Sequence, residues 1–225
     1  MVKIHHEPKK EKQTMEVRPM TEQDIDAAAS VHLRAFKGYM NASLGRNYVR
    51  KFLNWFITSP IGIALVVADA GKPIGYVVGA GLGYDADLNK ALLKTGIKAI
   101  LSHPNILFHS HFLGTIASRL KLLLNKKKAS VKVNQEPSGT GVSLVGIAVD
   151  PANSKKGGGS MLMQSFEQKA RELGYNYMRL SVYEKNKTAR QLYSKSSWQP
   201  LEIESPVIYY YKEISDNKQV KSTVS

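Results

Sequence analysis

The chain has 225 residues, with 32 lysines and arginines against 18 acidic residues, and it contains no cysteine. This length suffices for one domain with its own core, and 43% hydrophobic residues is too many for a disordered chain. The missing cysteines exclude disulfides, thiolate metal clusters and a cysteine nucleophile. No apolar run approaches the ~18 residues of a membrane-spanning helix, and the polar start does not resemble a secretory signal, so we expect a cytoplasmic protein.

The net charge of +14 is distributed unevenly along the chain. A strongly basic chain suggests nucleic acid, an anionic membrane surface or an anionic small molecule as partner. The segment 88–128 has no acidic residue but holds these basic ones: Lys90, Lys94, Lys98, Arg119, Lys121, Lys126, Lys127 and Lys128.

Neither end of the chain shows apolar periodicity. We therefore expect residues 1–14 and 215–225 to be flexible tails on a single domain that spans residues 15–214. Within this domain, a first strand is predicted near residues 16–19.

Two helices are predicted next. Thr21 and Asp24 have the spacing of a capping box and open the first helix, and residues 47–57 form the second. His32 lies on the apolar side of the first helix, which favours a hydrogen-bonded core histidine over a catalytic one. Residues 63–67 and 74–78 then form a β-hairpin.

Two amphipathic helices are predicted within the basic segment 88–128. In the first, the lysines recur every four residues while Leu93, Ile97 and Ile100 share another face; in the second, apolar residues follow a helical stripe. A pair of histidines there, His109 and His111, is spaced unfavourably for a metal site on a helix.

The second half of the chain alternates strands and helices. Strands are predicted over 142–149, 177–183 and 207–211, with a helix between Gly159 and Gly174 and a short helix over 186–196. The order of elements indicates a mixed α/β fold.

The turn between residues 149 and 160 carries the clearest chemical signal. A strand ends at Val149 and a glycine-rich turn, Lys155-Lys156-Gly157-Gly158-Gly159-Ser160, leads into a helix. Free backbone N–H groups and the helix dipole make such a turn a site for an anion such as pyrophosphate, and the two lysines add positive charge. The alternative is an ordinary loop with surface lysines. The spacing fits neither a P-loop nor a dinucleotide-binding fingerprint.

A second motif follows one helix and one strand later: Asn186-x-x-Ala189-x-x-Leu192-Tyr193-x-x-x-Ser197-Trp198. Together the two motifs resemble those of the GNAT superfamily of acyl-CoA-dependent N-acyltransferases. The first departs from the family pattern at Ser154, where the family has Gln or Arg, and the second at Ser197, where it has Gly.

The resemblance implies a GNAT-like fold, with a central, mostly antiparallel, splayed sheet flanked by helices and an inserted basic helical pair over residues 88–128. It implies acetyl-CoA as co-substrate and no metal. The pantetheine arm would pair with the main chain of Ile147, Ala148 and Val149, and the loop of Lys155, Lys156, Gly157, Gly158, Gly159 and Ser160 would hold the pyrophosphate. Asn186 would either hydrogen-bond the pantetheine or cap its helix.

The resemblance also places Tyr193 at the position of the general acid, the alternative being a helix-core aromatic paired with Leu192. A phenol of pKa ~10 can protonate a leaving thiolate. The general base is not identified: Glu184, Glu202 and Glu204 are candidates, and the alternative is that no protein group serves as base. Ser197 is expected in a left-handed conformation, where a serine costs on the order of 1 kcal/mol. Alternate members of the run Tyr209-Tyr210-Tyr211 could line an acceptor pocket.

We therefore predict an N-acetyltransferase, monomeric or homodimeric, that acts on a primary amine of a small molecule by direct attack through a tetrahedral intermediate. The alternative is a non-catalytic acyl-CoA-binding or membrane-associated module. The insertion 88–128 could be a lid over the acceptor site, a contact to an anionic membrane surface or a site for an anionic acceptor. No recognised nucleic-acid-binding motif is present, so nucleic acid is the least favoured partner.

Overall fold

The computed structural model describes residues 15–102, 139–204 and 206–214. Its centre is a seven-stranded sheet of order β1-β2-β3-β4-β5-β7-β6. The strands are β1 (Glu16–Pro19), β2 (Gly62–Asp69), β3 (Lys72–Gly81), β4 (Gly141–Val149), β5 (Tyr177–Tyr183), β6 (Gln199–Glu204) and β7 (Val207–Glu213). The pair β4–β5 is parallel and the other neighbouring pairs are antiparallel. The predicted mixed α/β fold with a mostly antiparallel sheet is confirmed.

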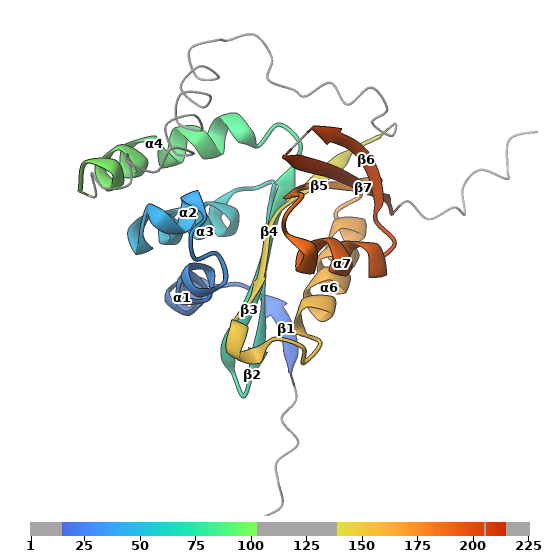
Figure 1. Ribbon diagram of the computed structural model, residues 1–225, viewed down its shortest axis with the longest axis horizontal. Coiled ribbons are helices and arrows are strands. Elements are labelled where there is room, and N and C mark those ends of the chain that lie inside the picture. Colours follow the sequence, from blue (N-terminus) through green and yellow to red (C-terminus); the bar gives the residue numbers. More distant parts are fainter. Residues whose placement is uncertain (1–14, 103–138, 205, 215–225) are drawn as a thin grey trace, which may run out of the picture.

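Helices cover both faces of this sheet (Figure 1). The face of α1 and α3 is opposite that of α6 and α7, and α4 packs beside α3. The α-helices are α1 (Ile25–Ala35), α2 (Met40–Ser43), α3 (Arg46–Thr58), α4 (Asp85–Ser102), α6 (Gly158–Glu172) and α7 (Lys187–Lys195), and the 3-10 turns are η1 (Glu22–Asp24) and η3 (Pro151–Asn153).

The core is divided by the sheet into two clusters. Because successive side chains of a strand point to opposite faces, Val66 packs with the helices α1 and α3 while its neighbour Val67 packs with α6. The ring of Phe56 and that of Phe166 are fully buried on the two sides. Each layer of helices therefore has its own apolar contact with the sheet, which holds the strands in a fixed register.

The N-terminal predictions are confirmed in detail. Asp24 accepts hydrogen bonds from the backbone N–H and the hydroxyl of Thr21, at 2.8 and 2.9 Å, so the capping box is present. Arg18 on β1 donates two further bonds of 2.7 Å to the same carboxylate and thereby ties the edge strand to the start of α1. In the hairpin, Ala70 and Gly71 both have positive φ, as a two-residue turn between twisted strands requires.

The predicted face of α4 needs correction. The buried residues of α4 are Leu88 and Leu92, whereas Leu93 and Ile97 are 43% and 50% exposed. Of the predicted stripe only Ile100 packs against the core, because the helix turns the side of Leu88 and Leu92 toward α3. The second predicted helix of the insertion lies outside the described residues, as do His109, His111 and both predicted tails.

Candidate active site

A gap between β4 and β5 provides the framework of the site. The two strands pair only at their amino-terminal ends, where Gly141, Val142 and Ser143 face Tyr177, Met178 and Arg179. Both strands continue without further pairing, β4 to Val149 and β5 to Tyr183. The sheet is therefore splayed, as predicted, and β4 has main-chain donors and acceptors along the gap that need a partner.

A β-bulge lies where the pairing ends. In the β3–β4 ladder Val78 faces Gly146 and Gly79 faces Leu144, so Val145 is the extra residue. A Cβ on Gly79 would lie 2.4 Å from both the ring of Phe166 and the carbonyl oxygen of Ser143, so this close approach requires glycine. Because a bulge bends its strand, it accounts for the point at which β4 leaves β5.

The glycine-rich turn lies at the carboxyl end of the splayed β4. After Val149 the chain forms η3 and then enters α6 at Gly157, whose φ of 89° is left-handed. This N-cap residue has no side chain to satisfy the first N–H groups of α6, and Met161 is the residue that bonds back to the Gly157 carbonyl. The N–H groups of residues 158–160 are therefore available to an anion.

The packing around these glycines supports close approach of a ligand. A Cβ on Gly158 would be 3.5 Å from its nearest neighbour, Val67, and one on Gly159 would be 3.8 Å from Leu192. Both are ordinary van der Waals distances, so the protein itself does not require glycine at these two positions. Their bare backbone fits a group that must lie against it, as the pyrophosphate of an acyl-CoA would.

Positive charge surrounds this turn. Lys155 and Lys156 are both exposed, and Lys156 donates a 3.0 Å hydrogen bond to Asn153. Lys155 adopts a positive φ of 68°, which is uncommon for a residue with a side chain. Neither lysine forms an ion pair with a described carboxylate, so their charge is available to a bound anion.

An ion pair that the sequence does not reveal fixes the start of the turn. Arg34 of α1 donates a 2.5 Å hydrogen bond to one carboxylate oxygen of Asp150, and the other oxygen accepts from the N–H of Ala152. The bond to Arg34 lowers the pKa of Asp150 below its ordinary value. No local pattern could have indicated this contact, because the partners are 116 residues apart.

The second motif forms the start and the inner side of α7. The Asn186 side chain accepts a 3.2 Å hydrogen bond from the N–H of Ala189, so of its two predicted roles the structure shows the helix cap. Leu192 faces Gly159, which places α7 beside the glycine-rich turn. Ser197 has a φ of 60°, so its predicted left-handed conformation is confirmed.

Tyr193 is a core residue of this region. It is 5% exposed, and its ring centroid lies 5.8 Å from that of Tyr210 and 6.0 Å from that of Trp198. Burial, with a smaller contribution from Tyr210, raises its pKa above the ordinary value. The phenol is therefore protonated at physiological pH, as a proton donor must be, although the same burial makes it a weaker acid.

The other tyrosines of β7 alternate as predicted for a strand. Tyr210 is buried, whereas Tyr209 and Tyr211 are half-buried on the opposite face. Tyr211 donates a 2.8 Å hydrogen bond to Gln199 of the neighbouring β6.

The candidate bases differ in how they are placed. Glu184 is exposed immediately after β5. Glu202 and Glu204 lie on β6, opposite Tyr209 and Val207 in the ladder.

His32 is 4% exposed and hydrogen-bonded through Nδ1 to the Tyr76 hydroxyl at 2.5 Å, so the predicted core histidine is confirmed. Burial lowers its pKa to about 4.

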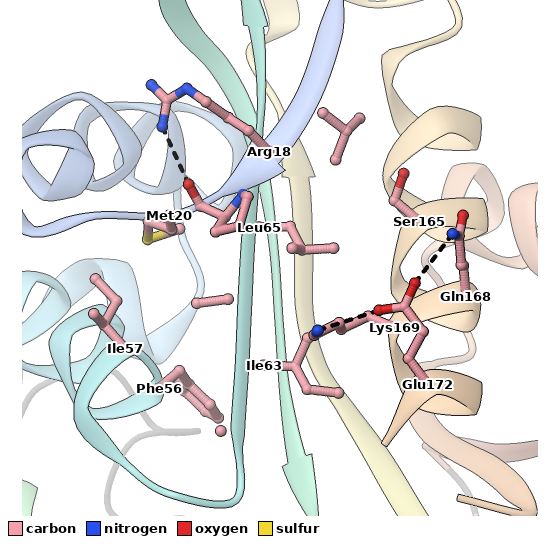
Figure 2. Close-up of a pocket in the computed structure, with 14 residues that line it drawn as sticks. Arg18, Met20, Phe56, Ile57, Ile63, Leu65, Ser165, Gln168, Lys169 and Glu172 are labelled. Carbon is pink, nitrogen blue, oxygen red and sulfur yellow. Dashed lines mark hydrogen bonds and ion pairs between the residues drawn. The ribbon is translucent and has the colours of Figure 1, made fainter. Parts of the chain in front are cut away.

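A cavity of about 440 Å³ lies at the β1–β2 edge of the sheet, between the end of α3 and α6 (Figure 2). Its polar side is formed by α6, where Glu172 accepts bonds from Gln168 and Lys169 at 3.1 and 3.2 Å. No residue of β4, the glycine-rich turn or α7 lines it. Gln168, Lys169 and Glu172 therefore bind one another rather than presenting free polar groups to the cavity. In the described ranges no group of three metal-ligating side chains occurs, and no helix there is long and apolar enough to cross a bilayer.

Comparison with known proteins agrees with this geometry. The sequence profile of the Acetyltransferase (GNAT) family matches residues 31–197. PaiA N-acetyltransferase from Thermoplasma acidophilum, solved in complex with coenzyme A, is 11% identical with a TM-score of 0.57, over 89% of this chain and 99% of that chain. The ribosomal-protein-S18-alanine N-acetyltransferase from Escherichia coli is 12% identical with a TM-score of 0.55, over 92% and 98%. Ard1 from Thermoplasma volcanium is 15% identical with a TM-score of 0.53, over 90% and 99%. No curated protein matches the chain by sequence.

The profile match covers most of the chain and includes both motifs, and the solved structures share the fold. The chain belongs to the GNAT family. It is an acetyltransferase, and the acyl donor of this class of enzyme is acetyl-CoA.

Proposed function

We propose that the protein transfers the acetyl group of acetyl-CoA to a primary amine of a small molecule in the gap between β4 and β5. The observation that carries this proposal is the position of the glycine-rich turn at the open end of the gap. A donor whose pyrophosphate binds the N-terminus of α6 has its arm directed along the unpaired edge of β4.

Three groups of residues would bind the donor. The N–H groups of Gly158, Gly159 and Ser160 receive the pyrophosphate, Gly157 sets the turn, and Lys155 and Lys156 add charge. The main chain of Ile147, Ala148 and Val149 pairs with the pantetheine as an additional strand would. The fit of bare glycine backbone to a phosphate group supports the first of these assignments.

The chemistry requires few side chains. Bound acetyl-CoA supplies a thioester. A neutral amine attacks the carbonyl carbon of this thioester directly. In this proposal a main-chain N–H near Val149 stabilises the oxyanion, and Tyr193 donates a proton to the departing sulfur. Asn186 fixes the start of α7 and thereby the position of Tyr193. Among the described side chains Glu184 is the candidate that would receive the proton of the amine.

The test is release of coenzyme A thiol across a panel of small primary amines, with the acetylated product identified by mass spectrometry. We expect thiol release to depend on the amine and to match product formation. Release that no amine accelerates, in protein that binds acetyl-CoA, would contradict amine acetylation.

A second candidate role concerns the outer face of α4. Lys90, Lys94 and Lys98 are exposed there together with Leu93, Ile97 and Leu101, the last at 76%. Basic and apolar side chains on one helix face suit contact with an anionic membrane surface. Sedimentation with anionic and neutral liposomes tests this role: equal binding to both, or none, contradicts it.

A further inference from the structure

Three side chains meet at the wide end of the β4–β5 gap. Tyr39 lies in the segment between α1 and α2, Tyr183 is the last residue of β5, and Lys185 follows in the next turn. The two tyrosine rings are 6.0 Å apart. The ammonium nitrogen of Lys185 is 5.8 Å from the ring centroid of Tyr39 and 5.7 Å from that of Tyr183. One ammonium is therefore held against two aromatic rings at once, as in a cation–π site.

The position of Tyr39 and Tyr183, the tyrosine pair, indicates that it lies where the acceptor approaches. Tyr183 is four residues beyond Arg179, the last residue of β5 that pairs with β4. On β5, Met178, Leu180 and Val182 point into the core on the α6 side. Successive side chains of a strand point to opposite faces, so Tyr183 faces the α1 side of the sheet. The glycine-rich turn leads into α6 on the other side. The tyrosine pair is thus across the gap from the expected donor, where an acceptor must approach.

Neighbouring aromatic rings hold Tyr39 in place, while Tyr183 remains accessible to solvent. Tyr39 packs edge-on against Phe36 at 5.8 Å, and Phe36 against the buried His32 at 4.8 Å. Tyr183 is 43% exposed, and Lys185 is exposed. No described carboxylate forms an ion pair with Lys185, so the ring faces are what hold its ammonium. Another alkylammonium can replace it, because the displaced lysine returns to water at little cost.

We propose that Tyr39 and Tyr183 bind a second, positively charged nitrogen of the acceptor, so that the substrate is a linear diamine or a longer polyamine. One nitrogen reacts as the free amine while the other, as an ammonium, takes the place of Lys185 on the two rings. In the reaction the acetyl carbon bonds to nitrogen, the carbon–sulfur bond breaks, the nitrogen loses a proton and the sulfur gains one. The inference rests on the proposed function for this step and adds the class of acceptor.

The experiment compares diaminobutane with butylamine, which lacks the second nitrogen. Binding is measured by calorimetry in the presence of coenzyme A, and acetylation is measured on the same protein. We expect diaminobutane to bind roughly threefold to tenfold more tightly. Tyr183→Leu should abolish this preference, and Tyr39→Leu repeats the test from the other ring. Lys185→Met should strengthen diaminobutane binding, whereas Lys195→Met, a matched change of an exposed lysine at the end of α7, should not.

The outcomes separate this inference from the proposed function. Equal affinity for the two amines, or a preference that survives both tyrosine variants, overturns the diamine site even where acetylation proceeds. A preference that requires both tyrosines supports it. If diaminobutane binds in this way and no amine is acetylated, the site stands and the proposed reaction fails.

Discussion

Arg34 on α1 and Asp150 at the end of β4 form a 2.5 Å ion pair that joins the helical layer to the start of the glycine-rich turn. Asp150 is the residue at which the direction of the turn is set, because its other carboxylate oxygen caps η3 and its N–H donates to the carbonyl of Ile74. Helix α1 is thus tied to the residue at which the chain turns toward the expected pyrophosphate site.

Removing this contact should weaken donor binding. In Arg34→Met we expect the KM for acetyl-CoA to rise about threefold with little change in kcat, because Arg34 is half-exposed and exposed ion pairs contribute modestly. Steady-state kinetics measures this. Arg50→Met is the matched control, since Arg50 forms an equally short, exposed pair with Asp26 on α1, away from the turn. An equal effect of both variants would show that Arg34 has no specific role.

Much of the fold could be predicted from local patterns, because strands and helices with one buried face repeat their apolar residues at fixed spacing. The strand β6 was not predicted. It is an edge strand that contains Pro200 and two glutamates, pairs on one side only with β7, and is interrupted by a register shift after Pro200. Proline and charged residues are uncommon within strands, so local analysis does not indicate a strand here, although Leu201 and Ile203 alternate with Glu202 and Glu204.

The features of the site, like those of the fold, were predicted only where a local pattern in the sequence indicates them. The glycine-rich turn and the cap at Asn186 are local sequence features and were predicted. The contacts of Arg34 with Asp150 and of Tyr39 with Tyr183 join residues more than a hundred positions apart, and only the folded sheet brings them together.

Gly159→Ala should separate ligand binding from folding. The added methyl would meet Leu192 at 3.8 Å, so we expect an unchanged or slightly raised melting temperature. Affinity for coenzyme A should fall roughly tenfold, because the methyl prevents the backbone from donating to a phosphate at close range. Calorimetry and thermal unfolding measure the two effects. Gly96→Ala in α4, where a Cβ has 3.6 Å of space, is the control and should leave affinity unaltered. Full affinity in Gly159→Ala would exclude this backbone from the site.

Tyr193→Phe should lower kcat by about 10²-fold, the usual contribution of a positioned proton donor, without changing the melting temperature. Tyr210→Phe removes the neighbouring hydroxyl of the same buried cluster and should leave kcat unchanged. Single-turnover kinetics on both variants makes the comparison. Wild-type kcat in Tyr193→Phe would leave this tyrosine with a packing role alone.

Ser197→Gly should stabilise the fold. The serine has a φ of 60° at the end of α7, and glycine relieves this strain by about 1 kcal/mol in the free energy of unfolding. Ser196, with a φ of −99°, provides the control, because glycine there relieves no strain. Chemical denaturation measures both, and equal effects of the two substitutions would contradict the explanation.

The buried His32 predicts a pH dependence of stability. Burial lowers its pKa from 6.5 to about 4 in the folded protein, so between these pH values the unfolded chain binds a proton that the folded chain does not. The stability that the neutral, buried His32 contributes is therefore fully present above pH 6.5 and is lost as the pH falls through 4. The double variant His32→Leu/Tyr76→Phe removes both hydrogen-bonding partners together and should flatten the melting temperature over this range relative to wild type. An unchanged slope would show that His32 titrates normally.

The measurement that tests the account most directly is amide hydrogen exchange with and without acetyl-CoA. The account predicts new protection in β4 from residue 144 to 149 and in the turn from residue 155 to 160, with the β1–β2 edge and the cavity of Figure 2 unchanged. Protection confined to the residues that line that cavity, with β4 and the turn unaffected, would contradict it.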